Sequence, residues 1–399
     1  MHTELFMKNN KNGVQMMKRM NRGTVIYLAT VIFSVLFVLV GNLVCRPQIF
    51  NEGEEDYHRA TVVKIGDITE DQYSLDDGET MVSNKRITFT AKMKSGPYKG
   101  DTVEVVQDVD DMYAYQPRDV KVGDKILVSR PGYDTEGEVN WVFIEHNRIG
   151  TIIWLIAIFL LLIVIIGRRK GISTIISLIF TVLAIFLVYI PSILKGYNIY
   201  LMTVIVSVFT IFMSLILISG WSLKTLCAIS GNVMGIAISG ILAVVMSNIL
   251  GLTGMIDEDY VLLTLMDTPV NLRAVLWGGV CIGALGAIMD VAMSIASAMK
   301  ELNDTMSDKS FFRMLRSGMN IGRDAIGTMT NTLILAYIGG ALATVLLLVA
   351  YNKNMYYLFN MEMIMAEILS AIVGSIGILA AVPATAIISA YVFNRWEEN

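Results

Sequence analysis

The chain has 399 residues, of which 54% are hydrophobic and 17% charged, and its mean hydropathy is +0.59. Soluble domains carry about a quarter charged residues, so this composition excludes a wholly soluble protein and predicts an integral membrane protein. The formal net charge of −4 gives no basis for binding nucleic acid, and we expect no such partner.

The first apolar run covers residues 24–45 and follows a predicted cytoplasmic N-terminus, residues 1–23. Lys18, Arg19 and Arg22 precede the run, as basic residues precede a secretion signal. The run is longer than the apolar part of a signal peptide, however, and no cleavage site of small residues follows it. We therefore expect residues 24–45 to be a retained transmembrane helix.

Residues 46–148 form the predicted aqueous domain and hold 13 Lys+Arg against 21 Asp+Glu, a net charge of −8. Short runs of alternating apolar and polar residues, bounded by Gly, Pro and Asp, predict about five strands. The runs are 58–68, 87–107 with a turn at 95–97, 120–130 and 138–146. A small all-β domain is expected, either a sandwich or a barrel, and an OB-like barrel is one option.

Two groups in this domain raise the question of metal binding. Asp108, Asp110 and Asp111 are hard oxygen ligands that suit Ca²⁺, or else a solvated acidic loop. His58 and His146 lie at the two ends of the predicted strands and would have to meet in space to share an ion. Neither group has the spacing of a known metal site, so we predict no metal.

Seven further apolar spans are predicted in residues 149–393, which makes eight in all. They cover residues 149–167, 171–190, 199–219, 225–250, 274–299, 325–350 and 364–392, and residues 394–399 form a C-terminal tail. Outside residues 46–148, fifteen of the eighteen basic residues fall in segments on one side of these spans. Because cytoplasmic loops are enriched in Lys and Arg, both termini are predicted to be cytoplasmic and the β domain to lie outside.

An aspartate in the sixth span is the most unusual residue of the membrane region. Asp290 lies ten residues before Lys300, roughly 15 Å from the end of the span. It falls on a stripe of small and polar residues, which are Gly283, Ala287, Asp290, Ser294 and Ser297. Since a central carboxylate is costly against lipid, Asp290 is expected either to carry a proton or cation or to hydrogen-bond neighbouring helices.

The last two spans add further candidates. In the seventh, Asp324, Thr328 and Asn331 share a face, and Asn331 is expected at a depth similar to that of Asp290. Asp324 would otherwise only cap the helix. In the eighth, Glu367 begins a stripe with Ser370, Gly374 and Gly377. We take Asp290, Asn331, Glu367 and Asp324 as ion- or proton-coupling candidates. Helix-packing or path-lining candidates are Gly283, Ser294, Ser297, Thr328, Gly374 and Gly377.

Several enzyme motifs are missing from the sequence. It holds no GxxxxGK[ST] phosphate loop, no HExxH zinc pair and no GxSxG nucleophile elbow. We therefore expect no enzymatic activity, no catalytic residues and no cofactor.

Three long stretches resemble the bacterial YibE/F family of multi-pass membrane proteins. They are GALGAIMDVAMSIASAMKEL (283–302), SGMNIGRDAIGTMTNTLILAYIGGAL (317–342) and NMEMIMAEILSAIVGSIGILAAVPATA (360–386). The resemblance implies a bacterial cytoplasmic membrane protein and a transporter or permease, and it assigns no catalytic residues. A looser similarity to RND and SecD/SecF transporter halves rests on Asp290, the Thr-rich 328–332 segment and Gly374-Ser375-Gly377. It implies coupling to protons.

Two functions from different classes follow from these features. The first is a permease driven by an ion or proton gradient, with Asp290 as the coupling group and an ion or small polar molecule as substrate. The second is a non-transporting scaffold or envelope sensor that acts through the acidic outer domain. The expected partners are the lipid bilayer and either further copies of the chain or a second membrane subunit.

Overall fold

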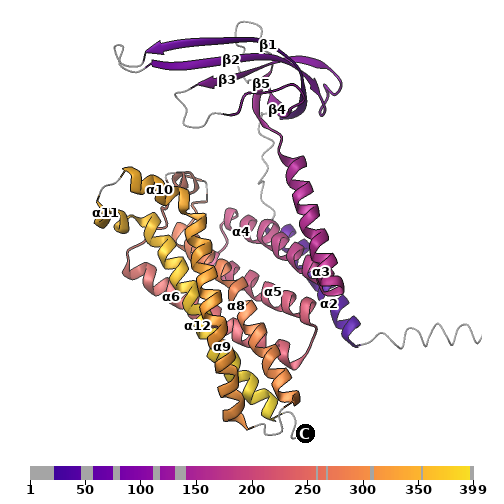
Figure 1. Cartoon of the computed structure of the whole chain (residues 1–399), viewed down its shortest axis with the longest axis vertical. Coiled ribbons are helices and arrows are strands. Elements are labelled where there is room, and N and C mark those ends of the chain that lie inside the picture. The colour runs from indigo at the N-terminus through magenta and orange to yellow at the C-terminus, as the bar shows by residue number, and fades with distance from the viewer. Residues whose placement is uncertain are drawn as a thin grey trace, which may run out of the picture. The chain divides into compact units, whose positions relative to one another are not determined.

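The computed structural model describes residues 22–45, 57–74, 81–110, 117–130, 141–257, 259–266, 268–305, 310–351 and 354–395. The chain divides into two compact units, one of Met1–Ile49 with Ile163–Asn399 and one of Phe50–Leu162 (Figure 1). The boundary between Leu162 and Ile163 falls inside a helix, whereas the prediction placed the end of the aqueous domain at residue 148, before that helix. The predicted cytoplasmic tails lie outside the described residues, apart from a few residues next to the spans.

The smaller unit contains a closed five-stranded β-barrel. Its strands are β1 (His58–Ser74), β2 (Met81–Met93), β3 (Thr102–Asp110), β4 (Lys125–Ser129) and β5 (Val142–His146), in the order β1-β2-β3-β5-β4. Pairing is antiparallel except between β3 and β5. The predicted turn at residues 95–97 joins β2 to β3, and Gly96 adopts a φ of 73° there.

Alternation along these strands places every second side chain inside the barrel. Ala91, Val105, Ile126 and Val128 are fully buried there, and Trp141 is 2% exposed. The all-β domain is thus confirmed, and of the two predicted architectures the barrel is the one observed. The OB-like assignment stays a prediction.

The larger unit is helical. Its helices are α2 (Arg22–Cys45), the second part of α3 (Ile149–Ala184), η1 (Ile185–Tyr189), α4 (Ile190–Leu194), α5 (Ile199–Ser219), α6 (Leu223–Ile249), α7 (Tyr260–Thr264), α8 (Leu272–Thr305), α9 (Phe311–Gly340), α10 (Leu342–Tyr351), α11 (Met355–Asn360) and α12 (Glu362–Arg395). Within the described residues, six helical stretches are long and apolar enough to cross a membrane, or seven if α9 and α10 form one broken span. The predicted count of eight is not confirmed.

The difference in count arises partly in α3, which continues through η1 and α4 to Leu194 and is one stretch of 46 residues. Arg168 interrupts it with a φ of 49°. Gly171 lies directly against the carbonyl oxygen of Ile163, eight residues earlier, whereas a straight helix would separate them by about 12 Å. The chain therefore reverses at Arg168, between the predicted spans 149–167 and 171–190.

Residues 325–350, predicted as one span, fall in two helices, α9 and α10. α9 begins fourteen residues earlier, at Phe311, and α10 bends away from it by 58° after Gly339-Gly340. Two consecutive glycines have low helix propensity, which accounts for the break at this position. Because Ser310 occupies the N-cap position of α9, Asp324 lies well inside the helix and does not cap it.

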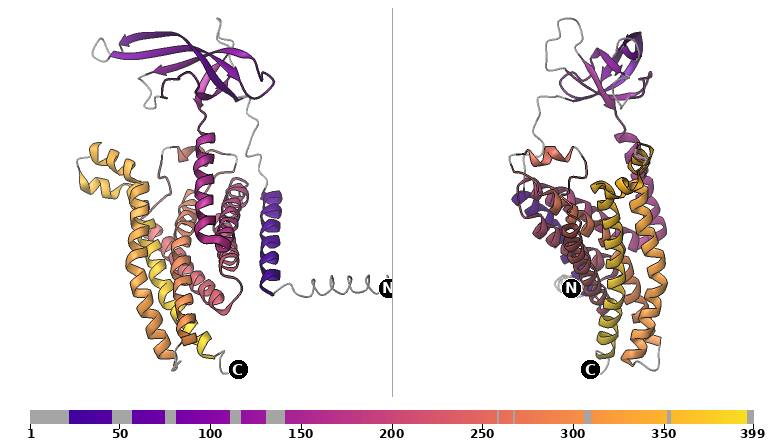
Figure 2. Two further views of the ribbon diagram at one scale, coloured as in Figure 1. Left: turned by 45° about the vertical axis from the view of Figure 1, so that its right-hand side comes forward. Right: turned by 90° about the vertical axis from the view of Figure 1, so that its left-hand side faces the viewer.

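The core of the larger unit lies where α6, α8, α9 and α12 pack together (Figures 1 and 2). Gly235 of α6 faces Gly377 of α12, and Ile288 of α8 packs against both glycines. Small residues allow this close approach of two backbones. The crossing fixes the positions of the helices that carry the candidate residues.

Candidate functional site

The candidate site is the polar side of α8 and its surroundings on α9 and α12. On α8, Gly283, Asp290 and Ser294 are exposed, and Ala287 and Ser297 are half-buried. The opposite side of α8, which includes Ile288 and Ile295, is fully buried in the core. The predicted stripe therefore forms one side of the helix, and its middle part at Asp290 and Ser294 is exposed in a single copy of the chain.

Asp290 has an exposed side chain in the middle of this stripe. Within the described residues it makes no hydrogen bond and no ion pair. Lys300, the next charged residue along α8, pairs instead with Asp304 at a distance of 2.6 Å. The carboxyl group of Asp290 is therefore available to an ion, to water or to another polypeptide.

α9 packs antiparallel to α8 and presents its own polar side. Gly322 lies against Ile295, and Tyr337 lies against Gly283. Asp290 and Asn331 both fall between these two contacts, so they occupy the same stretch of the helix pair, as predicted. Both side chains are exposed, and no hydrogen bond joins them in the described part of the chain.

The other polar residues of α9 are also exposed. Asp324 and Thr328 share the exposed side with Asn331. The hydroxyl of Thr328 donates to the carbonyl of Ala325 at 3.1 Å. Arg323 donates to the side chain of Asn320 rather than to Asp324. The polar side of α9 thus extends the stripe of α8.

α12 contributes Glu367 and two packed glycines. Glu367 is half-buried and lies within electrostatic reach of Tyr337, the residue that faces Gly283. Gly374 contacts Leu333 and Ala284, and Gly377 contacts Gly235, so both glycines are packed between helices. Sequence patterns did not single out Tyr337, although a tyrosine within an apolar span is a recognisable signal.

A second group of polar residues lies inside the core. Asn232 of α6 is fully buried, and neither its amide nitrogen nor its amide oxygen has a hydrogen-bond partner in the described residues. Thr385 of α12, also fully buried, has an unpartnered hydroxyl and lies against Gly231, next to Asn232 in the chain. Buried polar groups without partners cost about 1–3 kcal/mol each, so this crossing lowers the stability of the helical unit.

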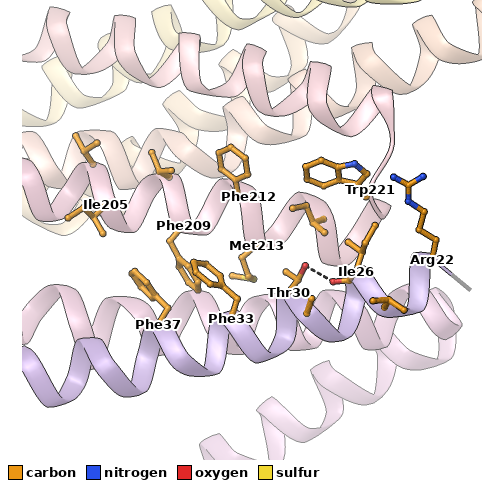
Figure 3. A pocket seen from close by; sticks show the side chains of 15 residues that line it. Arg22, Ile26, Thr30, Phe33, Phe37, Ile205, Phe209, Phe212, Met213 and Trp221 are labelled. Carbon is orange, nitrogen blue, oxygen red and sulfur yellow. Dashed lines mark hydrogen bonds between the residues drawn. The ribbon is translucent and has the colours of Figure 1, made fainter. Parts of the chain in front are cut away.

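A large apolar groove in the helical unit contains none of the candidate residues. The groove has a volume of about 1180 Å³ and lies between α2 and α5, and Figure 3 shows Phe33 and Phe37 of α2 beside Phe209 of α5. The rings of Phe37 and Phe209 stack at 3.9 Å. Arg22 and Trp221 lie at one end, and the hydroxyl of Thr30 donates to the carbonyl of Ile26. This apolar lining suits acyl chains rather than an ion.

The barrel residues considered for metal binding have other contacts. Asp108 pairs with Arg86 at 2.7 Å, and this interaction raises the pKa of Arg86. His58 packs against Trp141, and His146 bonds the carbonyl of Arg118 at 2.8 Å. Asp111 lies outside the described residues. No group of three or more His, Cys, Asp or Glu gathers in the part of the chain that the structure describes.

Comparison with known protein families matches residues 155–395 to the family described as YibE/F-like protein. The match covers more than half of the chain and all of the helices that carry the candidate residues. No curated protein and no solved structure matches the chain. The similarity to RND and SecD/SecF transporters is therefore not shown.

Proposed function

The chain belongs to the YibE/F-like protein family, and on this premise we propose that it is a membrane permease driven by an ion or proton gradient, with Asp290 as the coupling group. The substrate is an ion or a small polar molecule. The polar sides of α8 and α9 form one wall of its path, and a second membrane-embedded surface, provided by another copy of the chain, closes it.

The exposed carboxyl group of Asp290 carries this proposal. A carboxylate at the centre of a membrane helix costs about 2.5–3.5 kcal/mol when it faces lipid. Asp290 has no partner within the described chain, so water, an ion or a second polypeptide has to stabilise it. Gly283 and Ser294 on the same side are small enough for another helix to approach closely.

We further propose eight spans, with the helical stretch from Ile149 to Leu194 crossing the membrane twice through its reversal at Arg168. In this arrangement both termini are cytoplasmic and the β-barrel lies outside the bacterial cytoplasmic membrane. The enrichment of Lys and Arg in alternate connections supports this orientation.

Proton movement across reconstituted vesicles tests the proposal. The full chain and its Asp290→Asn variant are placed in liposomes containing a pH-sensitive dye, and a pH difference of one unit is imposed. We expect the unsubstituted chain to dissipate the difference faster than empty liposomes, and Asp290→Asn to reduce the rate to that of empty liposomes. Asp290→Glu, which keeps a carboxyl group, should retain part of the activity.

Asp304→Asn is the matched control, because Asp304 is exposed at the end of the same helix and pairs with Lys300. Size-exclusion chromatography of each variant separates loss of coupling from loss of folding. Equal rates for Asp290→Asn and the unsubstituted chain would refute the permease. A scaffold or sensor would instead lose its function in cells on deletion of residues 52–146 and be indifferent to Asp290→Asn.

A further inference from the structure

A polar cavity of about 340 Å³ opens where α6 ends and α8 begins. Its polar lining comes from three helices and the connections between them, and Trp277 and Val244 form its inner wall. The polar residues that face it include Tyr200, Ser247, Asn248, Asn271 and Arg273. None of these is a candidate for the coupling path, and the cavity lies on a different face of α8 from Asp290.

Arg273 gives this cavity a positive charge. One guanidinium nitrogen donates to the side-chain oxygen of Asn248 at 3.0 Å. No carboxylate pairs with Arg273 in the residues that the structure describes. A guanidinium has five N–H donors in a fork that matches a phosphate. Arg273 therefore keeps donors for an anion.

The surroundings of Arg273 favour an anion further. The side chain of Asn271 accepts a hydrogen bond from the backbone N–H of Ala274, at the start of α8. The N-terminal end of α8, where the helix dipole is positive, therefore lies at this cavity. Glu362 is close to the rim, but its carboxylate already accepts hydrogen bonds from Thr253 and from the backbone N–H of Gly254. These bonds occupy acceptor sites of the carboxylate and orient it toward Thr253 and Gly254.

An apolar cavity of about 430 Å³ continues from the polar one between α5, α6 and α8, and the two share Val244 and Trp277. The indole N–H of Trp277 donates to the carbonyl of Gly240 at 2.8 Å, which fixes the ring at the junction. Val204 and Ile241, which are 50% and 66% exposed, form its open side. The cavity is therefore open along the apolar surface of the helical unit.

One polar group lies within the apolar cavity. Ser207 is 3% exposed, and its hydroxyl has no hydrogen-bond partner in the described residues. A buried hydroxyl without a partner is costly, and an ester oxygen of an occupant would satisfy it. The two cavities together thus offer an anion site, an apolar channel and one hydrogen-bond donor.

We propose that the two cavities are one site for a membrane lipid with an anionic phosphodiester headgroup. The phosphate binds Arg273 and the amide of Asn271, and one acyl chain lies along the cleft between α5 and α6. The wide groove between α2 and α5 differs, because its lining places no side-chain amide beside Arg22 (Figure 3).

Native mass spectrometry of the full chain in detergent tests this site. The protein is titrated separately with phosphatidylglycerol and phosphatidylcholine that carry identical acyl chains. We expect one phosphatidylglycerol per chain to bind in preference to phosphatidylcholine. Arg273→Gln should weaken phosphatidylglycerol binding about tenfold, the loss of one charge-assisted hydrogen bond. Binding of phosphatidylcholine, whose phosphate charge is offset by the choline cation, should fall less in the same variant.

Lys224→Gln is the matched control, since it removes the same charge at the opposite end of α6. Val244→Phe tests the apolar part by filling the junction and should reduce binding of both lipids. Equal binding of the two lipids, an unchanged affinity in Arg273→Gln, or an equal loss in Lys224→Gln would overturn the proposal. Binding of glycerol phosphate as tightly as the lipid would also overturn it, because the acyl chain would then contribute nothing.

Discussion

Replacing Gly235 by alanine is expected to force α6 and α12 apart. A methyl group at this position would lie 2.8 Å from Ile288 Cγ2, 2.9 Å from the carbonyl oxygen of Gly377 and 3.0 Å from Ala381 Cβ. Carbon contacts are optimal only at about 3.5–4.0 Å. Ile288 is able to change rotamer, whereas the carbonyl of Gly377 moves only with the backbone of α12.

The magnitude follows from two opposing effects. Overpacking costs about 1–3 kcal/mol, and the higher helix propensity of alanine returns up to about 1 kcal/mol. We expect a net loss of about 1–2 kcal/mol in the free energy of unfolding. For a unit of this size that loss lowers the unfolding temperature by about 2–8 °C.

Thermal unfolding of the purified chain in detergent, followed by circular dichroism at 222 nm, measures this shift. Gly150→Ala is the control, because nothing lies within 4 Å of a methyl group at that helical position. An unchanged or raised unfolding temperature in Gly235→Ala would refute the close crossing of α6 and α12, as would an equal decrease in Gly150→Ala.

Three further predictions address other parts of the chain. Trp141→Ala should destabilise the barrel by about 3–5 kcal/mol, seen as faster proteolysis, whereas Trp154→Ala, 72% exposed in α3, should leave proteolysis unchanged. Arg168→Gly should stabilise the helical unit by about 1 kcal/mol in thermal unfolding, because φ is positive there; a decrease would contradict the reversal. The carboxylate of Asp119 accepts a hydrogen bond from Lys85 and raises the pKa of Lys85. The stabilisation from a charged Lys85 should therefore be fully present just below its unfolded pKa of about 10.4. It should disappear as the pH rises through the higher pKa of the folded state. The stability of Lys85→Met, measured by unfolding, should not show this loss at high pH.

Much of the architecture could be predicted because it depends on local periodicity. Alternation identified the strands of the barrel, and the basic residues at 168–170 marked the point where α3 reverses. The spacing of Gly283, Asp290 and Ser294 correctly placed them on one side of α8. These features depend on the residues of one element and its immediate neighbours in the chain.

The remaining features depend on contacts between distant segments. The start of α9 at Phe311 was missed because its first turns are too polar to count as a membrane span. The unpartnered amide of Asn232 is evident only once α8 and α12 are packed around it. The cavity at Arg273 requires three helix ends to meet, and spacing within one helix carries no information about that meeting.

The bend between α9 and α10 has a consequence for how deeply the helical unit sits in the bilayer. Tyr351 and Tyr356 beyond the bend are 82% and 81% exposed, and tyrosines of this kind favour the headgroup layer. α9 has 30 residues and is therefore about 45 Å long, whereas the hydrocarbon layer is about 30 Å thick. In the proposed eight-span arrangement, tyrosines that hold one end of α9 at the headgroups would place the first turns of α9 beyond the opposite face of the membrane, with Arg316 at the level of the lipid phosphates. In that arrangement the length of α9 would set the depth of Asp290, on the neighbouring helix α8, within the bilayer.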